Sequence, residues 1–125
     1  MKVSGLVDIL NGIHDRLAVV VIDPVNGTET PVHKHRYNRD GGWSQFMLIL
    51  CFDGEPADVH MDTDWLKHIL DYELSDPDYK PSFFSNEPFL GEYDVKVSYQ
   101  NGSYTNATSC VCGDGRLKIF IEESL

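Results

Sequence analysis

Side chains that commonly bind metals gather in two short stretches of the sequence. On an extended strand, His33 and His35 point to the same face, as a pair of zinc ligands must. On a helix, Asp64 and His68 are four residues apart and again share a face. The residues that could act together in this way are His33, His35, His60, Asp62 and His68. Such a set would serve a small metal-dependent hydrolase or a ligand-binding protein.

The spacing of these residues matches no established metal motif. The sequence has no HExxH, and the residues after Asp62-Thr63-Asp64 lack the glycine that a calcium loop needs at its sixth position. An exposed polar strand and an acid-rich helix start explain the same residues, because the helix dipole favours acids at that end. We therefore expect no bound metal and no cofactor, and we keep the metal-dependent hydrolase as the alternative.

Three cysteines could support thiol chemistry, but their spacing is not specific for any one kind of site. Cys110 and Cys112 would share one face of a strand, but a tetrahedral zinc site needs a second pair of ligands, for which Cys51 and His35 are the candidates. Cysteines in the core of the protein are the interpretation that we favour. Cys51 lies in an apolar stretch where a thiolate would be costly, and the sequence has no G-x-S-x-G motif and no phosphate-binding loop. We predict no catalytic residue.

The composition indicates where the protein works. An odd number of cysteines without an apolar leader favours a reducing cytoplasm, which we expect to be that of a bacterial host. No stretch approaches the roughly 20 apolar residues that cross a bilayer. We therefore predict a cytoplasmic protein that does not bind membranes.

The net charge of −10 is concentrated in the middle third of the chain. Residues 53–94 contain twelve acids and only two bases, Lys67 and Lys80, whereas acids and bases balance in residues 1–52 and 95–125. A local acidic field attracts a cation or a basic partner and repels nucleic acid. The only basic cluster is Lys34-His35-Arg36 with Arg39, which is too small for a phosphate-binding surface. We expect no direct binding of nucleic acid.

The acidic segment is the best candidate for a contact surface. Acids spaced over several turns imitate a run of phosphates, so they would attract a protein with a basic nucleic-acid groove. Aromatic residues in the same segment could add a desolvated anchor. The predicted partner-binding residues are Asp62, Asp64, Asp71, Asp76, Asp78, Tyr79, Phe83 and Phe84. The alternative is an acidic face that only keeps the protein soluble.

Two similar series of elements would position these residues. In residues 1–52, an amphipathic helix runs from Val3 with Ser4 as its N-cap and Gly12 as its stop, and strands follow at 19–22, 30–37 and 44–52 around an Asn26-Gly27 turn. The acidic segment, 53–92, begins a second helix at Asp62, whose apolar stripe is Trp65, Leu66, Ile69, Leu70 and Leu74. Strands at 93–99, 105–112 and 117–122 form the C-terminal meander, 93–125.

These elements predict an α+β fold for a single domain, residues 1–125. Two short helices would pack on antiparallel sheet formed from two three-stranded meanders. An internal α-β-β-β duplication explains the two series, and the general pattern of β-meanders explains them equally well. The composition leaves open whether the protein forms a homodimer.

The opening of the chain resembles short phage and prophage proteins. The resemblance is carried by residues 3–10, with a V-x-x-L-x-x-x-L helix pattern, and by the strand Val19-Val20-Val21-Ile22-Asp23. Residues 115–121 resemble the final strand of such proteins, whereas the long segment 53–92 departs from their pattern. The resemblance implies a small acidic protein that blocks host defence or nucleic-acid enzymes by binding them. We therefore expect a non-enzymatic phage-type accessory protein, an inhibitor of a host protein with a basic surface.

Overall fold

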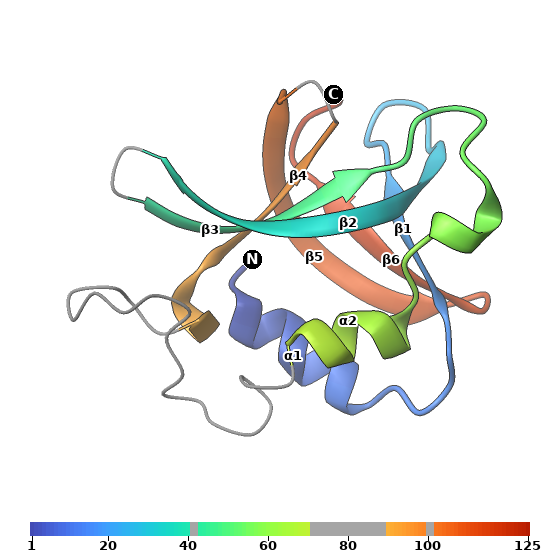
Figure 1. Ribbon diagram of the computed structural model, residues 1–125, viewed down its shortest axis with the longest axis horizontal. Helices are drawn as coiled ribbons and strands as arrows, with labels where there is room; N and C mark the ends of the chain where they lie inside the picture. Colours follow the sequence, from blue (N-terminus) through green and yellow to red (C-terminus); the bar gives the residue numbers. More distant parts are fainter. Residues whose placement is uncertain (41–42, 71–89, 100–101) are drawn as a thin grey trace.

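The computed structural model describes residues 1–40, 43–70, 90–99 and 102–125, in which six strands close into a barrel (Figure 1). The first series of elements consists of α1 (Val3–Asn11), β1 (Ala18–Ile22), β2 (Glu29–Asp40) and β3 (Trp43–Leu50). The second consists of the short 3-10 helix η1 (Ala57–Val59), α2 (Thr63–Ile69), the 3-10 helix η2 (Leu90–Glu92), β4 (Asp94–Ser98), β5 (Tyr104–Gly113) and β6 (Arg116–Ile121). The α+β fold predicted from the sequence is confirmed.

Each series of three strands forms an antiparallel meander, as predicted. Within the first, β1 pairs with β2 and β2 with β3; within the second, β4 pairs with β5 and β5 with β6. The two meanders meet at parallel pairs, β3 with β4 and β6 with β1, and these close the barrel. The parallel pairs are an addition to the predicted sheet. Because parallel neighbours need a long crossover, the acidic segment is the connection that returns the chain from β3 to the start of β4.

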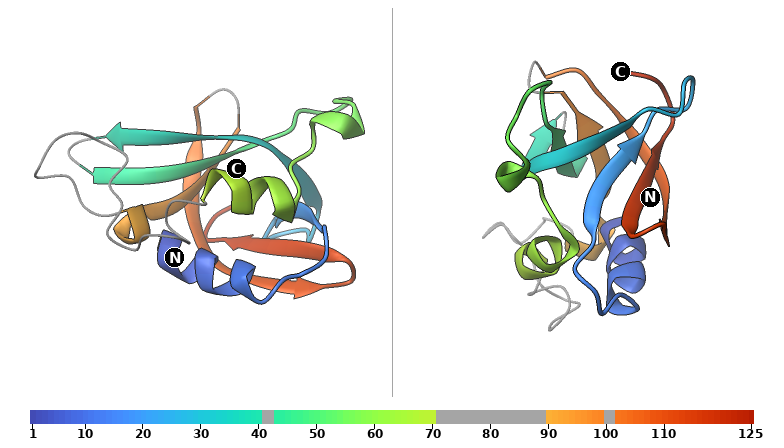
Figure 2. Two further views of the ribbon diagram at one scale, coloured as in Figure 1. Left: turned by 60° about the horizontal axis from the view of Figure 1, so that its bottom comes forward. Right: turned by 90° about the vertical axis from the view of Figure 1, so that its right-hand side faces the viewer.

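Both helices lie on the same side of the barrel, next to each other (Figures 1 and 2). The apolar face of α1 is buried, and Leu66 of α2 and Leu70 at its C-cap are fully buried. These side chains join the inward residues of the strands, such as Phe46 and Leu48, in one apolar cluster. No helix in the described ranges has the length and apolar character needed to span a membrane.

The turn residues of the sequence act as predicted at two hairpins. Gly27, in the loop between β1 and β2, has φ of +73°, a conformation that favours glycine. Asp114 and Gly115 have φ of +55° and +75°, and Gly113 pairs with Arg116 across them. Two successive residues with positive φ make the tight turn that matches the twist of antiparallel strands.

The beginning of α1 differs from the prediction. Ser4 is not the N-cap, because the helix starts at Val3 and its N-cap position is Lys2, which makes no capping side-chain hydrogen bond. The Val3 amide instead donates to the carbonyl of Tyr93 at 2.9 Å. Lys2 also forms an ion pair with Asp94 at 2.8 Å, so the helix start is attached to the beginning of β4. Gly12 ends the helix as expected.

The second helix is described from Thr63 to Ile69, and one residue of its predicted apolar stripe is exposed. Asp62 caps it as predicted, accepting a hydrogen bond from the Trp65 amide at 2.8 Å. The inclusion of Trp65 in the buried stripe was wrong, because this side chain is 52% exposed. Leu74 and the expected stop at Asp76-Pro77 lie outside the described residues.

Candidate functional site

The start of α2 carries the two predicted partner-binding residues that the structure describes, Asp62 and Asp64. The remaining members of that predicted set lie outside the described residues: Asp71, Asp76, Asp78, Tyr79, Phe83 and Phe84. The geometry of the candidate site can therefore be built from α2 and the segments that contact it.

Asp62 is engaged within the protein. Its Oδ1 accepts from the Trp65 amide at 2.8 Å, and its Oδ2 lies 2.5 Å from Nε of Arg16. Burial acts to raise the pKa of the Asp62 carboxyl, but the hydrogen bonds from Trp65 and Arg16 prevail, so the pKa is lowered. The carboxylate thus connects the start of α2 to the loop that precedes β1.

Hydrogen bonds from α2 fix that loop in place. The buried Thr63 hydroxyl donates to the carbonyl of Asp15 at 3.0 Å and accepts from the Leu17 amide at 2.9 Å. The Thr63 amide donates to the carbonyl of Leu17 at 2.8 Å, and Nζ of Lys67 donates to the carbonyl of Ile13. A helix of seven residues would be marginal alone, so these contacts explain how it holds a defined position.

The outward side of the helix presents an acid next to a pair of aromatic rings. Asp64, Trp65 and His68 are all exposed, and we call this group the α2 outer surface. The Trp65 and His68 rings stack, with centroids 5.3 Å apart and planes at 29°. A large exposed indole beside a carboxylate can bury apolar area and also meet a cation on a partner. The sequence pattern pointed to Asp64 but assigned Trp65 to the core.

The candidate metal ligands have different neighbours. His33 Nδ1 lies 2.8 Å from Oε1 of Glu55, close enough for an ion pair but without the alignment of a hydrogen bond. His35 instead contacts the ring of Phe46 at 5.8 Å between centroids, and burial lowers its pKa. A bulge between Val32 and Lys34 interrupts the alternation on which the shared face of the two histidines was predicted.

The other members of the predicted metal set are used elsewhere. His60 lines a cavity of about 230 Å³ with residues at the start of β2 and in the segment after β3, whereas Asp62 and His68 belong to the second helix and its cap. Within the ranges that the structure describes, no three His, Cys, Asp or Glu side chains are close enough to hold a metal ion. The structure does not bring His33, His35, His60, Asp62 and His68 together.

The cysteines fall into two environments. Cys51 is buried, and its pKa is raised to about 12 by burial and by the neighbouring Glu55. Cys110 is buried in the core as predicted, but the same expectation for Cys112 was wrong, because Cys112 is exposed near the end of β5. Cys110 and Cys112 line a cavity that the sequence did not indicate.

A comparison of the chain with models of protein families, with curated proteins and with solved structures found no match in any of the three.

Proposed function

We propose that this protein is a non-enzymatic binding protein that docks through the α2 outer surface onto a basic surface of a partner protein and inhibits it. The observation that carries the proposal is the exposure of Trp65, half of whose surface is open beside Asp64. Tryptophan is among the residues that contribute most when buried at an interface. Its stacking on His68 limits its freedom before binding, which reduces the entropy lost on docking.

The rigidity of the helix supports the same proposal. Contacts of Asp62, Thr63 and Lys67 with the loop before β1 hold α2 against the barrel. A surface that is already in its binding conformation loses less free energy on association than one that must become ordered. The proposed contact residues are therefore Asp64, Trp65 and His68, while Asp62 acts by positioning them.

The charge of the chain supports a basic partner. The acids of the segment 53–94 include exposed Asp53 and Asp58 in addition to Asp64. Such a field accelerates encounter with a basic surface and suppresses approach to nucleic acid itself. Proteins that handle nucleic acid carry basic surfaces, and the resemblance of the opening residues to phage proteins supports a host protein of that kind, or one used in defence, as the partner.

The experiment is a pull-down from bacterial lysate followed by affinity measurement with the purified partner. Wild-type protein is compared with Trp65→Ala, Asp64→Lys and the control Phe52→Ala, which also removes an exposed aromatic ring, 59% exposed, outside α2. We expect Trp65→Ala to weaken binding by 2 kcal/mol or more, roughly 30-fold, as at an interface hot spot. Asp64→Lys should slow association and reduce its dependence on salt.

The outcomes separate a specific surface from a general charge effect. Retention of the partner by Phe52→Ala together with its loss from Trp65→Ala supports docking through α2. Equal retention by both variants would contradict the proposal. Inhibition is then tested by adding the wild-type protein to the partner's own assay, with Trp65→Ala as the inactive comparison.

A further inference from the structure

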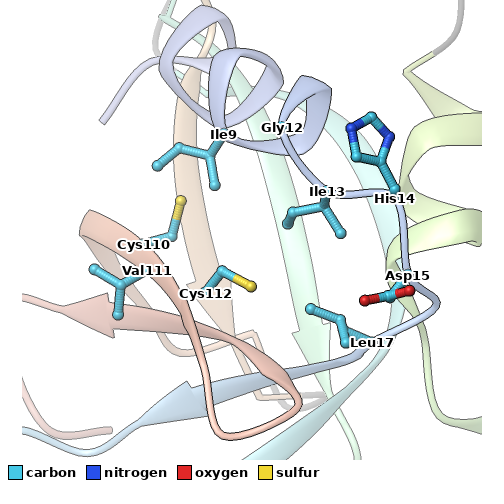
Figure 3. A pocket seen from close by; sticks show the side chains of 9 residues that line it. All are labelled: Ile9, Gly12, Ile13, His14, Asp15, Leu17, Cys110, Val111 and Cys112. Atoms are coloured by element: carbon cyan, nitrogen blue, oxygen red, sulfur yellow. The ribbon is translucent and has the colours of Figure 1, made fainter.

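A cavity of about 520 Å³ lies where strand β5 continues past the end of α1 (Figure 3). The helix ends at Asn11 with Gly12 as its cap, and the last residues of β5 border the cavity opposite the segment that leads from α1 to β1. A volume of this size is within the range of sites that hold small organic molecules, which are mostly apolar with a few well-placed polar groups.

The walls of this cavity are mainly apolar. They are formed by Ile9, Ile13 and Leu17 on the helix side and by Cys110, Val111 and Cys112 on the strand side. Protonated thiols pack as small apolar groups, so they fit such a wall. Val111 is 48% exposed, and a ligand that covers it would remove apolar area from water.

The helix-side wall is already in place without a ligand. The Thr63 hydroxyl bonds to the backbone of Asp15 and Leu17, and Nζ of Lys67 donates to the carbonyl of Ile13. These contacts fix the segment 13–17 against α2. A preformed wall reduces the free energy that is lost when a ligand binds.

The charge at the edge of the cavity is negative. Asp15 belongs to the lining, and its carboxylate lies on the same side of the cavity as Leu17 (Figure 3). Among the residues that the structure describes, this carboxylate has no ion-pair partner. The C-terminal end of α1 borders the same cavity and carries the partial negative charge of the helix dipole, and its last turn contains no basic residue.

The positive groups nearby do not cancel this charge inside the cavity. Lys67 is not part of the lining, and its ammonium group donates to the carbonyl of Ile13. His14 does line the cavity, but its ring is directed away from Cys110 and Cys112 (Figure 3). The net charge of −10 on the chain also favours the approach of a cation over that of an anion.

We propose that this cavity binds a small molecule with an apolar hydrocarbon body and a positively charged amine at one end. The hydrocarbon lies between the two apolar walls, and the ammonium group lies at the edge, beside Asp15 and the end of α1. Binding is non-covalent and leaves both thiols protonated. The proposal does not depend on docking through α2.

The first test compares ligands that differ only in their polar end. Isotopically labelled protein is titrated with octylamine, 1-octanol and octanoate, and binding is followed by amide NMR shifts. We expect octylamine to bind most tightly and octanoate most weakly, with the largest shifts in residues 9–17 and 110–112. Hexylamine has two methylene groups fewer and should bind roughly tenfold more weakly than octylamine, because less apolar area is buried.

Variants with matched charge locate the binding site. Asp15→Asn should weaken the binding of octylamine by about fivefold, the upper range for an ion pair open to solvent, and leave 1-octanol unaffected. Asp8→Asn is the control, since it removes the same charge from an exposed position of α1 outside the lining. Cys112→Trp places an indole ring at the cavity and should abolish binding, and thermal unfolding verifies that this variant is folded.

Alkylation of the wild-type protein gives a readout that needs no variant. Bound octylamine should slow the reaction of Cys112 with iodoacetamide and leave that of Cys51, which does not line the cavity, unchanged. The proposal would be overturned if 1-octanol bound as tightly as octylamine, or if Asp15→Asn and Asp8→Asn weakened binding equally. Retention of octylamine by folded Cys112→Trp, or no binding of octylamine to the wild type, would also overturn it.

Discussion

The hydroxyl of Thr63 accepts a hydrogen bond from the amide of Leu17 at 2.9 Å, although the two residues are 46 positions apart in the chain. This contact joins the first turn of α2 to the loop that enters β1. The same hydroxyl donates to the carbonyl of Asp15, so one buried side chain forms hydrogen bonds with two backbone groups that lie outside helices and strands. The position of α2 relative to the segment between α1 and β1 therefore depends on Thr63, a polar residue without charge.

Replacement of Thr63 by valine tests this contact. Valine has the same shape but leaves the Leu17 amide and the Asp15 carbonyl without their partner, which we expect to lower the free energy of unfolding by about 1–3 kcal/mol. Thr63→Ser keeps the hydroxyl and should lose less. Urea unfolding of both variants measures the difference, and equal stability would show that the hydrogen bonds contribute nothing net.

The lowered pKa of Asp62 predicts a pH dependence. Burial acts against ionisation, but the hydrogen bonds from Trp65 and Arg16 lower the pKa below that of an unfolded aspartate, about 3.9. The ionised carboxylate therefore stabilises the folded state above pH 4, and this contribution is lost as the pH falls through the folded value. Asp62→Asn keeps a cap acceptor but has no charge. It should be less stable than the wild type at pH 7, and in urea unfolding the difference should shrink as the pH falls below about 3.9.

A companion variant separates the cap from the charge. Asp62→Ala loses the acceptor for the Trp65 amide and should cost about 1 kcal/mol at neutral pH, the usual effect of removing an N-cap. If Asp62→Asn and Asp62→Ala were equally stable at pH 7, the cap would have no part in holding α2.

The strands and turns could be predicted because their signals are local. Alternation located β6, whose inward residues Leu117, Ile119 and Ile121 are buried, and glycine-containing pairs marked the hairpins. Closure of the barrel could not be predicted in this way. The parallel pairing of β3 with β4 joins segments separated by the whole acidic crossover. The periodicity within a strand does not indicate which other strand lies next to it.

The candidate site was predictable only in part for the same reason. Asp62 was recognisable as a helix cap, but its pairing with Arg16 links residues 46 apart. Trp65 and Leu66 are adjacent, and a helix of seven residues is too short for the period to show which of them faces inward. The exposure of Cys112 depends on where α1 and β5 end relative to each other, which the strand pattern does not contain.

In the tight turn between β5 and β6, we expect alanine substitution at two glycines to have very different effects on stability. Gly115 has φ of +75°, where an L-residue is strained, so Gly115→Ala should lower stability by about 1–2 kcal/mol. Gly113 lacks a positive φ, and a Cβ added there meets no atom within 4 Å, so Gly113→Ala should change stability by less than about 0.5 kcal/mol. Thermal unfolding compares them, and a similar loss in both would mean that φ at 115 is not the cause.

We predict that Glu55 reduces the reactivity of the Cys51 thiol, which it contacts. Its carboxylate accepts from the Phe52 amide at 3.1 Å and lies beside Cys51, whose pKa is raised to about 12 by burial and then by this carboxylate. Glu55→Gln keeps the shape but removes the negative charge, so the Cys51 thiolate forms more readily. We expect several-fold faster alkylation of Cys51 by iodoacetamide at pH 9–10, measured by peptide mass mapping. Cys110 is the internal control, because its pKa is raised by burial alone. Equal acceleration of both cysteines would indicate a loosened fold rather than the removal of a charge.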